Sequence, residues 1–417
     1  MAQDIIPFSE IKTGMKGIGK TVFEGTRVED FQVEVIGTLE HVAPRRNLIL
    51  VRLSGGPLAN TGVLSGMSGS PIFFGERLAG AVAYTWGFAR EPVAGVTPIQ
   101  EMLQVEDKET PAAARPGARR TSAPLIGSPV ALLMHPEKLP AHFASYFDDL
   151  PPPGASAPVM TPIATPFLFN GVSARAMEGL APALARAGLV PAQGGTTSRS
   201  STTTPGAESK IVPGAGVGIK LVRGDVEFAA ICTVTYRDKD QVMACGHPLL
   251  NLGPTDLIMT TASVNGLFPS LQESFKFASA GEEVGAFRQD RATGVFGYIG
   301  KRPRLIPVRL DLQPQMGHSQ AYAFDIVDDP FCWAHFYAGK VFLEGLALPP
   351  FTIRYIVLEK SKNPHSRLPS IPELRELAKR RGTLVYHCPL HRAGSKEEIE
   401  VFAVPNSAGT SSSPARQ

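Results

Sequence analysis

The sequence predicts a mainly β protein, and three observations support this fold class. Short segments of alternating or continuous apolar residues recur along the chain and are separated by turn residues. Glycine (41 residues) and proline (37 residues) are abundant among the 417 residues, as expected where many short strands are joined by turns. Strand-turn-strand patterns lie next to a serine turn at 66–72 and a Gly-His pair at 246–247.

The first 105 residues are rich in strand patterns. Residues 31–36 (Phe-Gln-Val-Glu-Val-Ile) alternate apolar and polar side chains, which is typical of a strand with one buried face. Residues 47–53 (Asn-Leu-Ile-Leu-Val-Arg-Leu) form an apolar run that predicts a buried strand. Both strands precede the serine turn.

Residues 66–72, Gly-Met-Ser-Gly-Ser-Pro-Ile, are the best candidate for a catalytic segment. Glycines on both sides of Ser68 allow backbone conformations that other residues avoid. Such a turn can direct the amides of Gly66 and Ser68 at one point, as in an oxyanion hole. Small Gly-Ser-Pro clusters also form ordinary turns, so this reading stays open beside the catalytic one. The strand, tight turn and strand of 71–84 would follow the serine directly.

The second strand-rich region begins near residue 211. Strands are predicted at 216–222 and 226–231, and a hairpin at 233–244 runs into Gly246 and His247. An imidazole within hydrogen-bond reach is the usual base for a serine nucleophile, so His247 is the candidate general base. A structural histidine is the alternative. Two further strands are predicted at 304–312 and 320–327.

Composition shifts divide the chain into seven parts. Residues 106–124 and 191–210 are rich in Pro, Ala, Gly, Ser or Thr and read as linkers. Ser173 and Gly188 bracket a short helix in the region between them, and residues 370–373 form a capping box for a second helix ending near 382. The predicted parts are a serine-bearing β segment (1–105), a linker (106–124), a helix-containing insertion (125–190), a linker (191–210), a histidine-bearing β segment (211–330), a C-terminal region with one helix (331–404) and a disordered tail (405–417).

Charge and hydropathy exclude several function classes. A net charge of +3 with no basic patch interleaved with aromatics argues against nucleic-acid binding. No apolar run approaches the ~18 residues of a transmembrane helix. Residues 1–7 lack the basic start and apolar core of a signal peptide. The contents of 43% hydrophobic and 19% charged residues are typical of a globular protein, and nothing in the sequence indicates its oligomeric state.

The cysteines suggest one pairing. If the hairpin closes around residues 237–240, Tyr236 faces Gln241 and Cys232 faces Cys245, close enough for either a disulfide or two buried thiols. The cluster at 387–391, with two histidines and one cysteine, has no standard zinc spacing and is read as a surface loop, so no metal site is predicted.

The serine segment at 66–84 resembles the SpoIVB peptidase family, serine endopeptidases first known from bacterial sporulation. Residues 233–248 resemble that family's histidine segment, and 281–300 the segment after it. The resemblance implies a chymotrypsin-like double β-barrel, a peptide or protein substrate, no cofactor, and a periplasmic or extracellular location.

Two features depart from the family pattern. Ser68 precedes His247, whereas the family has the histidine first; a triad is defined by geometry, so a permuted order is tolerable. The family has an aspartate about fifteen residues before the serine, and Ser54 stands at that place here. Asp256 and Asp290 are the candidate orienting carboxylates.

These observations together predict a double barrel assembled from residues 1–105 and 211–330. The expected function is a serine endopeptidase acting through Ser68 and His247. The alternative is a catalytically inactive module of the same fold that binds peptides or partner proteins by adding a strand to an exposed sheet edge.

Overall fold

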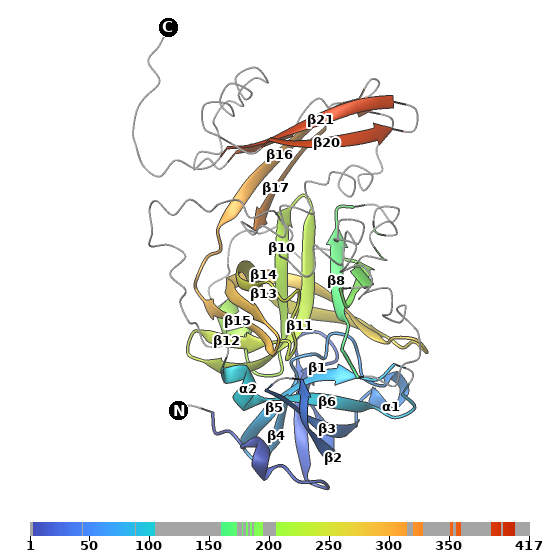
Figure 1. The fold of residues 1–417 in the computed structure, drawn as a ribbon, viewed down its shortest axis with the longest axis vertical. Coiled ribbons are helices and arrows are strands. Elements are labelled where there is room, and N and C mark those ends of the chain that lie inside the picture. Colours follow the sequence, from blue (N-terminus) through green and yellow to red (C-terminus); the bar gives the residue numbers. More distant parts are fainter. Residues whose placement is uncertain are drawn as a thin grey trace, which may run out of the picture. The chain divides into compact units, whose positions relative to one another are not determined.

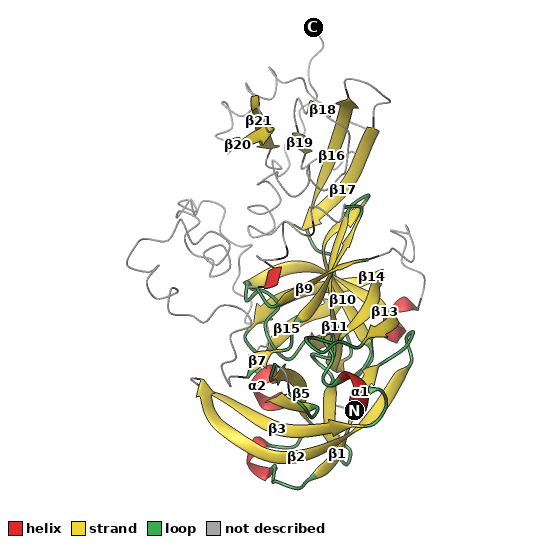
Figure 2. Cartoon of the chain, turned by 90° about the vertical axis from the view of Figure 1, so that its right-hand side faces the viewer, coloured by secondary structure: helices red, strands yellow, loops and turns green. Residues whose placement is uncertain are grey.

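The structure is a computed structural model. It describes residues 3–104 except 44 and 88, residues 160–172, parts of 177–194, residues 206–314 and 320–327, and the strand backbone at 351–352, 356–359, 385–392 and 395–404. Strands dominate this part of the chain (Figures 1 and 2). The chain divides into two compact units: one contains 1–170, 177–221 and 227–303, and the other contains 171–176, 222–226 and 304–417.

Six antiparallel strands close into a first barrel. In hydrogen-bonded order around the barrel they are β1 (Lys16–Val22), β2 (Val28–Ala43), β3 (Arg46–Ser54), β6 (Val93–Pro98), β5 (Arg77–Thr85) and β4 (Pro71–Phe74). The pairing of β4 with β1 completes the ring. The serine turn at 66–70 immediately precedes β4, so the barrel fixes its position.

The alternation predicted in β2 fills the core of this barrel. Phe31, Val33 and Val35 are buried, and the residues between them are partly or fully exposed. They pack with Ile49 and Val51 of β3 in one apolar cluster. Burial of one face therefore sets the register of these strands, since a slip by one residue would turn the apolar side chains outward.

A second ring of six antiparallel strands follows later in the chain, within the same unit. Its strands in order are β10 (Gly216–Gly224), β13 (Gly253–Phe268), β14 (Phe275–Arg291), β15 (Gly294–Ile299), β12 (Gln241–Ala244) and β11 (Glu227–Asp238), and β11 pairs back to β10. The double-barrel core predicted from the sequence is thus confirmed, with the serine and histidine on different barrels.

The histidine hairpin has a different register from the predicted one. Asp238, rather than Tyr236, faces Gln241, so the turn contains only two residues, and Lys239 there has a positive φ of 53°. A β-bulge between Val234 and Tyr236 then shifts the pairing. A bulge places an extra residue on one strand, and beyond it Val234 faces Ala244, so Cys232 and Cys245 are not directly opposite as predicted.

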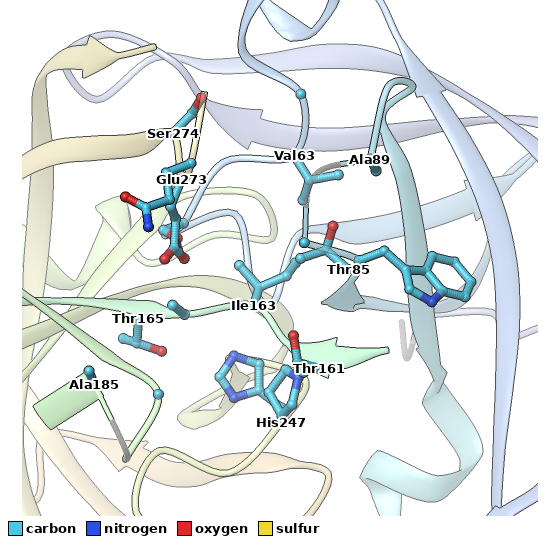
Figure 3. Close-up of a pocket in the computed structure, with 18 of the residues that line it drawn as sticks. Val63, Thr85, Ala89, Thr161, Ile163, Thr165, Ala185, His247, Glu273 and Ser274 are labelled. Carbon is cyan, nitrogen blue, oxygen red and sulfur yellow. Dashed lines mark hydrogen bonds between the residues drawn. The ribbon is translucent and has the colours of Figure 1, made fainter. Parts of the chain in front are cut away.

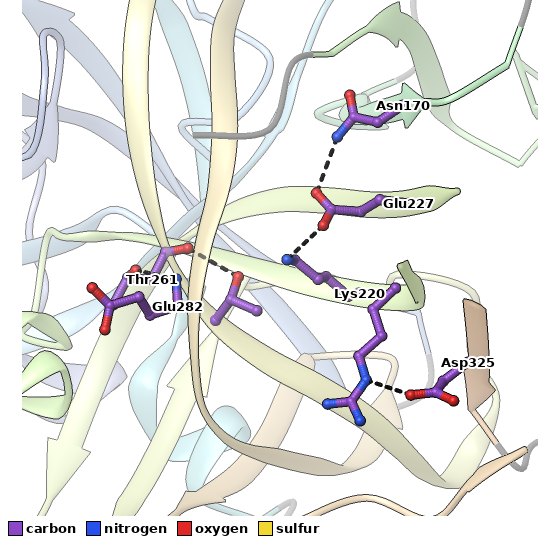
Figure 4. A network of polar contacts seen from close by, with 8 residues as sticks. Asn170, Lys220, Glu227, Thr261, Glu282 and Asp325 are labelled. Carbon is purple, nitrogen blue, oxygen red and sulfur yellow. Dashed lines mark hydrogen bonds and ion pairs between the residues drawn. The ribbon is translucent and has the colours of Figure 1, made fainter. Parts of the chain in front are cut away.

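Three shorter strands lie beside the barrels. β7 (Thr161–Pro162) pairs with β5, β8 (Thr165–Asn170) pairs with β11, and β9 (Leu189–Gln193) pairs with β8 in parallel. Figure 4 shows Asn170 of β8 bonded to Glu227 at 3.0 Å, which in turn pairs with Lys220 at 2.7 Å. Both charged groups are buried, so each compensates the other's loss of hydration.

Helices are short in the described residues of this unit. They are the 3₁₀ helices η1 (Phe8–Glu10) and η3 (Ala207–Lys210) and the α-helices α1 (Leu58–Thr61) and α2 (Ile99–Leu103). Among the described residues, no helix is long and apolar enough to cross a membrane. Helical residues recur between 177 and 185, and Gly188 has a φ of 72°, as expected for the end of the short helix predicted there.

The second unit contains further strands. β17 (Gln320–Val327) pairs with the end of β10 and with β16 (Leu305–Pro314); β16 also contacts β18 (Phe351–Thr352) and β19 (Ile356–Glu359). β19 runs parallel to β21 (Ser395–Val404), which pairs with β20 (Val385–Arg392). The predicted linker at 106–124, the helix near 370–382 and the tail at 405–417 lie outside the described residues. Residues 387–391 belong to β20, so the loop predicted there is wrong; their side chains lie outside the described part of the chain.

Candidate active site

The serine turn depends on two glycines. Gly66 and Gly69 have φ values of 93° and 94°, in a region that residues with side chains rarely adopt. A Cβ at Gly69 would lie 2.6 Å from the amide nitrogen of Cys245 and would overlap the carbonyl of Thr233. Glycine is therefore needed both for the turn itself and for its close contact with the second barrel.

The amides around Ser68 fall into two groups. Met67, Gly69 and Ser70 donate to the carbonyls of Leu64, Val82 and Met67 at 2.8–2.9 Å. The amides of Gly66 and Ser68, by contrast, have no acceptor among the hydrogen bonds of the described residues. Buried backbone donors without a partner are uncommon. These are the two donors that the sequence predicts for an oxyanion hole.

Ser68 is held against β11 of the second barrel. Its carbonyl accepts a hydrogen bond from the Thr233 amide at 2.8 Å, and its hydroxyl donates to the sulfur of Cys232 at 3.8 Å. Cys232 forms a disulfide with Cys245, and their Cα atoms are 5.2 Å apart. Of the two alternatives left open by the sequence, the disulfide is the one present. It fastens β11 to the chain two residues before His247.

His247 is presented by a turn with two consecutive positive φ values. Cys245 has a φ of 71° and Gly246 a φ of 72°. A Cβ at Gly246 would lie 3.0 Å from the Cβ of Ala81 on β5, and the Gly246 carbonyl accepts a 2.7 Å bond from the Thr97 hydroxyl on β6. The first barrel thus contacts the histidine turn directly.

The ring of His247 is buried and electrically neutral. Nδ1 lies 2.8 Å from the Pro248 carbonyl; since a carbonyl can only accept, Nδ1 carries the proton and Nε2 the lone pair. Nε2 is buried and has no hydrogen-bond partner among the described residues. Burial lowers the pKa of His247 to about 4, although the backbone carbonyls of Pro248 and Ile163 oppose this shift.

No hydrogen bond joins Ser68 and His247 within the described part of the chain. The serine hydroxyl is bonded to sulfur, and the histidine Nε2 has no partner. Their turns nevertheless touch, because Gly69 packs against the Cys245 amide. The structure thus brings both candidates to one interface between the barrels, without the direct bond expected of an assembled dyad.

The candidate carboxylates lie elsewhere. Asp290 is fully buried and accepts the amides of Leu249, Leu250 and Leu252 at 2.8, 2.8 and 3.1 Å. Burial raises the pKa of Asp290, while these backbone donors lower it. Asp290 therefore supports the loop that follows His247, and within the described residues it makes no hydrogen bond to the imidazole ring. Asp256 is buried and pairs with Arg288 at 2.7 Å.

Ser54, at the place of the family's aspartate, is exposed at the end of β3 opposite Gln32. The described residues place no carboxylate on the Nδ1 atom of His247; the Pro248 carbonyl occupies that position. Nor do they contain a group of three or more acidic, histidine or cysteine side chains able to hold a metal ion.

A buried lysine beside the serine turn was not singled out from the sequence. Lys276 on β14 is 2% exposed; its Cβ and Cδ lie 3.5 Å from a Cβ built on Gly66, and its Nζ donates to the Thr21 hydroxyl at 2.6 Å. Burial lowers its pKa to about 7. The sequence did contain an indication of this lysine: Lys276 alternates with Ala278 and Ala280 on the inward face of a strand, where lysine is rare.

A cavity of about 660 Å³ lies beside His247 (Figure 3). The first barrel contributes residues from the loops at 61–65 and 85–91, and the second barrel contributes 247–251 and 270–274. Residues 161–165 form another wall, and Figure 3 shows Thr161 and Ile163 near the His247 ring. The cavity is large enough for several side chains of a peptide.

Residues 2–103 match the family model of SpoIVB peptidase S55, roughly a quarter of the chain. The comparisons found no matching curated protein and no matching solved structure. The resemblance to SpoIVB peptidases is confirmed over the matched residues, which contain the whole first barrel and Ser68. It supports a serine peptidase in general. The similarity of 233–300 to the family's histidine segment lies outside the match and stays a prediction.

Proposed function

We propose that this protein is a serine endopeptidase that cleaves peptide bonds through an acyl-enzyme on Ser68, with His247 as the general base. The observation that carries the proposal concerns the amides of Gly66 and Ser68, which have no acceptor in the described part of the chain. They belong to the turn of a buried serine inside the segment that matches a peptidase family. An ordinary structural turn has no need to leave two buried donors without acceptors.

In the proposed reaction, Nε2 of His247 takes the proton of the Ser68 hydroxyl while Oγ attacks the peptide carbonyl carbon. The resulting oxyanion accepts hydrogen bonds from the amides of Gly66 and Ser68. Collapse of the intermediate breaks the C–N bond, and the imidazolium returns its proton to the departing amine. Water then attacks the acyl-enzyme by the same route and releases the acid. These steps require no cofactor.

The Pro248 carbonyl fulfils one of the two roles that the aspartate has in a catalytic triad. It accepts the Nδ1 proton and so holds the lone pair on Nε2, which is the tautomer that can act as a base. A neutral carbonyl stabilises an imidazolium less than a carboxylate does. Loss of the triad aspartate alone costs about 3 × 10⁴-fold in kcat in a well-studied serine protease, so we expect a slow enzyme.

A binding module of the same fold is the second candidate. The Ser68 hydroxyl bonds sulfur rather than imidazole, which favours this alternative. In that case the protein holds peptides by strand addition and leaves them intact. The two candidates differ in whether Ser68 is nucleophilic, and this property can be measured directly.

Labelling with a fluorophosphonate tests the proposal. Because Ser68 is buried, the reaction is followed for several hours and the adduct is mapped by mass spectrometry. We expect one adduct on Ser68, none in Ser68→Ala, and labelling slower by about 10²-fold or more in His247→Gln. Ser54→Ala, which removes an exposed serine, is the matched control and should label like wild type. Absence of an adduct both in folded wild type and in a folded variant with an exposed Ser68 contradicts the enzyme and favours the binding module.

A further inference from the structure

The edge of β5 next to the serine turn is occupied by another part of the same chain. The Gly69 amide donates to the Val82 carbonyl, and the Val82 amide donates to the Ser70 carbonyl, at 2.8 and 2.9 Å. At the next residue of β5, the Ala83 carbonyl accepts the Ile163 amide at 2.9 Å. Since β6 covers the opposite edge of β5, the serine turn and Ile163 share one edge.

Residues 160–165, here called the strap, continue along this edge as an added strand. Thr161 and Pro162 of β7 face Thr85 and Tyr84 in antiparallel register. The amide of residue 163 bonds β5, and proline, which has no amide hydrogen, is accepted at residue 162. This alternation is typical of a peptide that binds a sheet edge through its backbone.

The strap also contacts the other parts of the candidate site. The backbone carbonyl of Ile163 is close enough to His247 to raise the pKa of its ring. Beyond the strap, Pro166 packs against the serine turn, because a Cβ on Gly66 would lie 3.4 Å from its Cγ. With the strap in place, Ser68 is 0% exposed and His247 is 2% exposed. In this arrangement both side chains are almost fully shielded from solvent, although the cavity lies beside His247.

Both ends of the strap are attached to the core. The N-terminal end pairs with β5 of the first barrel, and the C-terminal end continues into β8, which pairs with β11 of the second barrel. Asn170, at the end of β8, bonds the buried Glu227 (Figure 4). The strap thus runs from one barrel to the other across the face where Ser68 and His247 approach.

We propose that the strap is a built-in pseudosubstrate that occupies the binding site of the substrate. The substrate is then an extended peptide with a branched aliphatic side chain at the position of Ile163. This inference rests on the proposed function. It explains why a serine turn with two unbonded amides is closed to solvent. It also assigns the edge of β5 as the binding site for the substrate backbone.

The side chains of the strap define the substrate class. Ile163 is 1% exposed and belongs to the apolar cluster of the first barrel, whereas Thr161 and Pro162 are exposed. Thr165 is also 1% exposed, so Ile163 is the buried aliphatic side chain of the strap and the one in the apolar cluster. Isoleucine, valine or leucine fits there, and a charged residue would lose its hydration without a partner.

Peptide binding without catalysis tests the inference. In Ser68→Ala protein, fluorescence anisotropy measures the affinity for a labelled peptide of the strap sequence, Met-Thr-Pro-Ile-Ala-Thr. Ile163→Ala removes side-chain contacts of the strap, and we expect it to bind the peptide at least tenfold tighter than protein with the intact strap. Ile163→Val keeps most of the side chain and should fall between them. Should the alanine variant not fold, the valine variant alone must still bind tighter.

Ile49→Ala is the matched control. Ile49 is also 1% exposed and belongs to the same apolar cluster, but it lies on β3 and not on the strap. We expect Ile49→Ala to bind the peptide as weakly as the protein with the native Ile163 does. A peptide with Asp in place of Ile should bind none of the variants. Equal affinities for Ile163→Ala and Ile49→Ala overturn the inference.

The same pair of variants separates this inference from the proposed function. With Ser68 present, Ile163→Ala should react with fluorophosphonate about tenfold faster than Ile49→Ala. Tight peptide binding with no labelling supports the pseudosubstrate and contradicts the enzyme. Labelling at one rate in both variants, with equal peptide affinities, supports the enzyme and overturns the pseudosubstrate.

Discussion

Replacing Lys276 by methionine should stabilise the fold and weaken the site. Lys276 is buried, and its ammonium donates to the Thr21 hydroxyl; its Nζ also lies 5.9 Å from the centre of the Phe23 ring. Within the described residues it makes no ion pair, unlike Lys220, which pairs with Glu227. An unpaired buried cation is costly, and proteins keep such groups mostly at functional sites.

The position of Lys276 suggests what that function is. Thr21 lies 3.1 Å from the Ser70 hydroxyl, which donates to the Met67 carbonyl at 2.6 Å. Met67 and Ser68 share one peptide group, so this relay ends on the group that carries the Ser68 amide. A positive charge at the far end polarises the relay, and we expect it to strengthen the Ser68 amide as a donor to an oxyanion.

The expected change in stability follows from the pKa of Lys276. Burial lowers that pKa from 10.5 to about 7. Each pKa unit corresponds to about 1.4 kcal/mol. Protonation of this lysine therefore stabilises the unfolded state relative to the folded state by up to about 5 kcal/mol. The folded state binds fewer protons, so this cost is absent above pH 10.5 and grows as pH falls towards 7. After loss of the Thr21 hydrogen bond, we expect Lys276→Met to gain about 2 kcal/mol at pH 7.

Urea unfolding at pH 7 and at pH 10 measures the effect, since a change in midpoint at constant slope reports stability. We expect a gain at pH 7 that shrinks or changes sign at pH 10, together with slower fluorophosphonate labelling. Lys220→Met is the matched control; it leaves the buried Glu227 carboxylate without its cation and should cost about 3 kcal/mol. Similar destabilisation by both substitutions would refute the reasoning. A stabilised Lys276→Met with unchanged labelling would refute the relay alone.

Three further predictions concern the serine and histidine turns. Because the pKa of His247 is lowered from 6.5 to about 4, the unfolded state protonates first, and stability should fall by about 3 kcal/mol from pH 6.5 to 4; His247→Gln should flatten this part of the pH profile in urea titrations. Cys232→Ser combined with Cys245→Ser removes a disulfide between residues 13 positions apart, and the free energy of unfolding should fall by about 3 kcal/mol, measured by thermal unfolding. Ser54→Asp should leave peptidase activity unchanged or raised. A large loss of activity in a folded variant would contradict this prediction.

Local sequence patterns predicted those features whose cause is local. A serine between two glycines implies a turn with positive φ, and the structure has it at Gly66 and Gly69. Alternation in residues 31–36 implies one buried face, and the barrel core contains that face. Each depends on the conformational range of a few neighbouring residues, which the sequence displays directly.

Features that depend on distant partners could not be predicted in the same way. The strap pairs with β5, about eighty residues earlier in the chain, and the sequence of residues 160–165 does not indicate which strand it will pair with. The buried environment of Lys276 is partly made by Thr21 and Phe23 of the first barrel. The cysteine pairing was foreseen from a hairpin register that was wrong: a two-residue turn and a bulge, both invisible in the local pattern, leave the cysteines one position out of register, and they are nevertheless joined.

The reversed order of Ser68 and His247 is compatible with one site because each barrel closes through its own strands. The ring from β1 to β6 contains no strand of the second barrel, and the ring from β10 to β15 contains none of the first. Contacts between the serine turn and the histidine turn therefore do not depend on which barrel comes first in the chain. The order does determine what connects them, and among the described residues of that connection, residues 160–165 pair with β5 beside the serine turn.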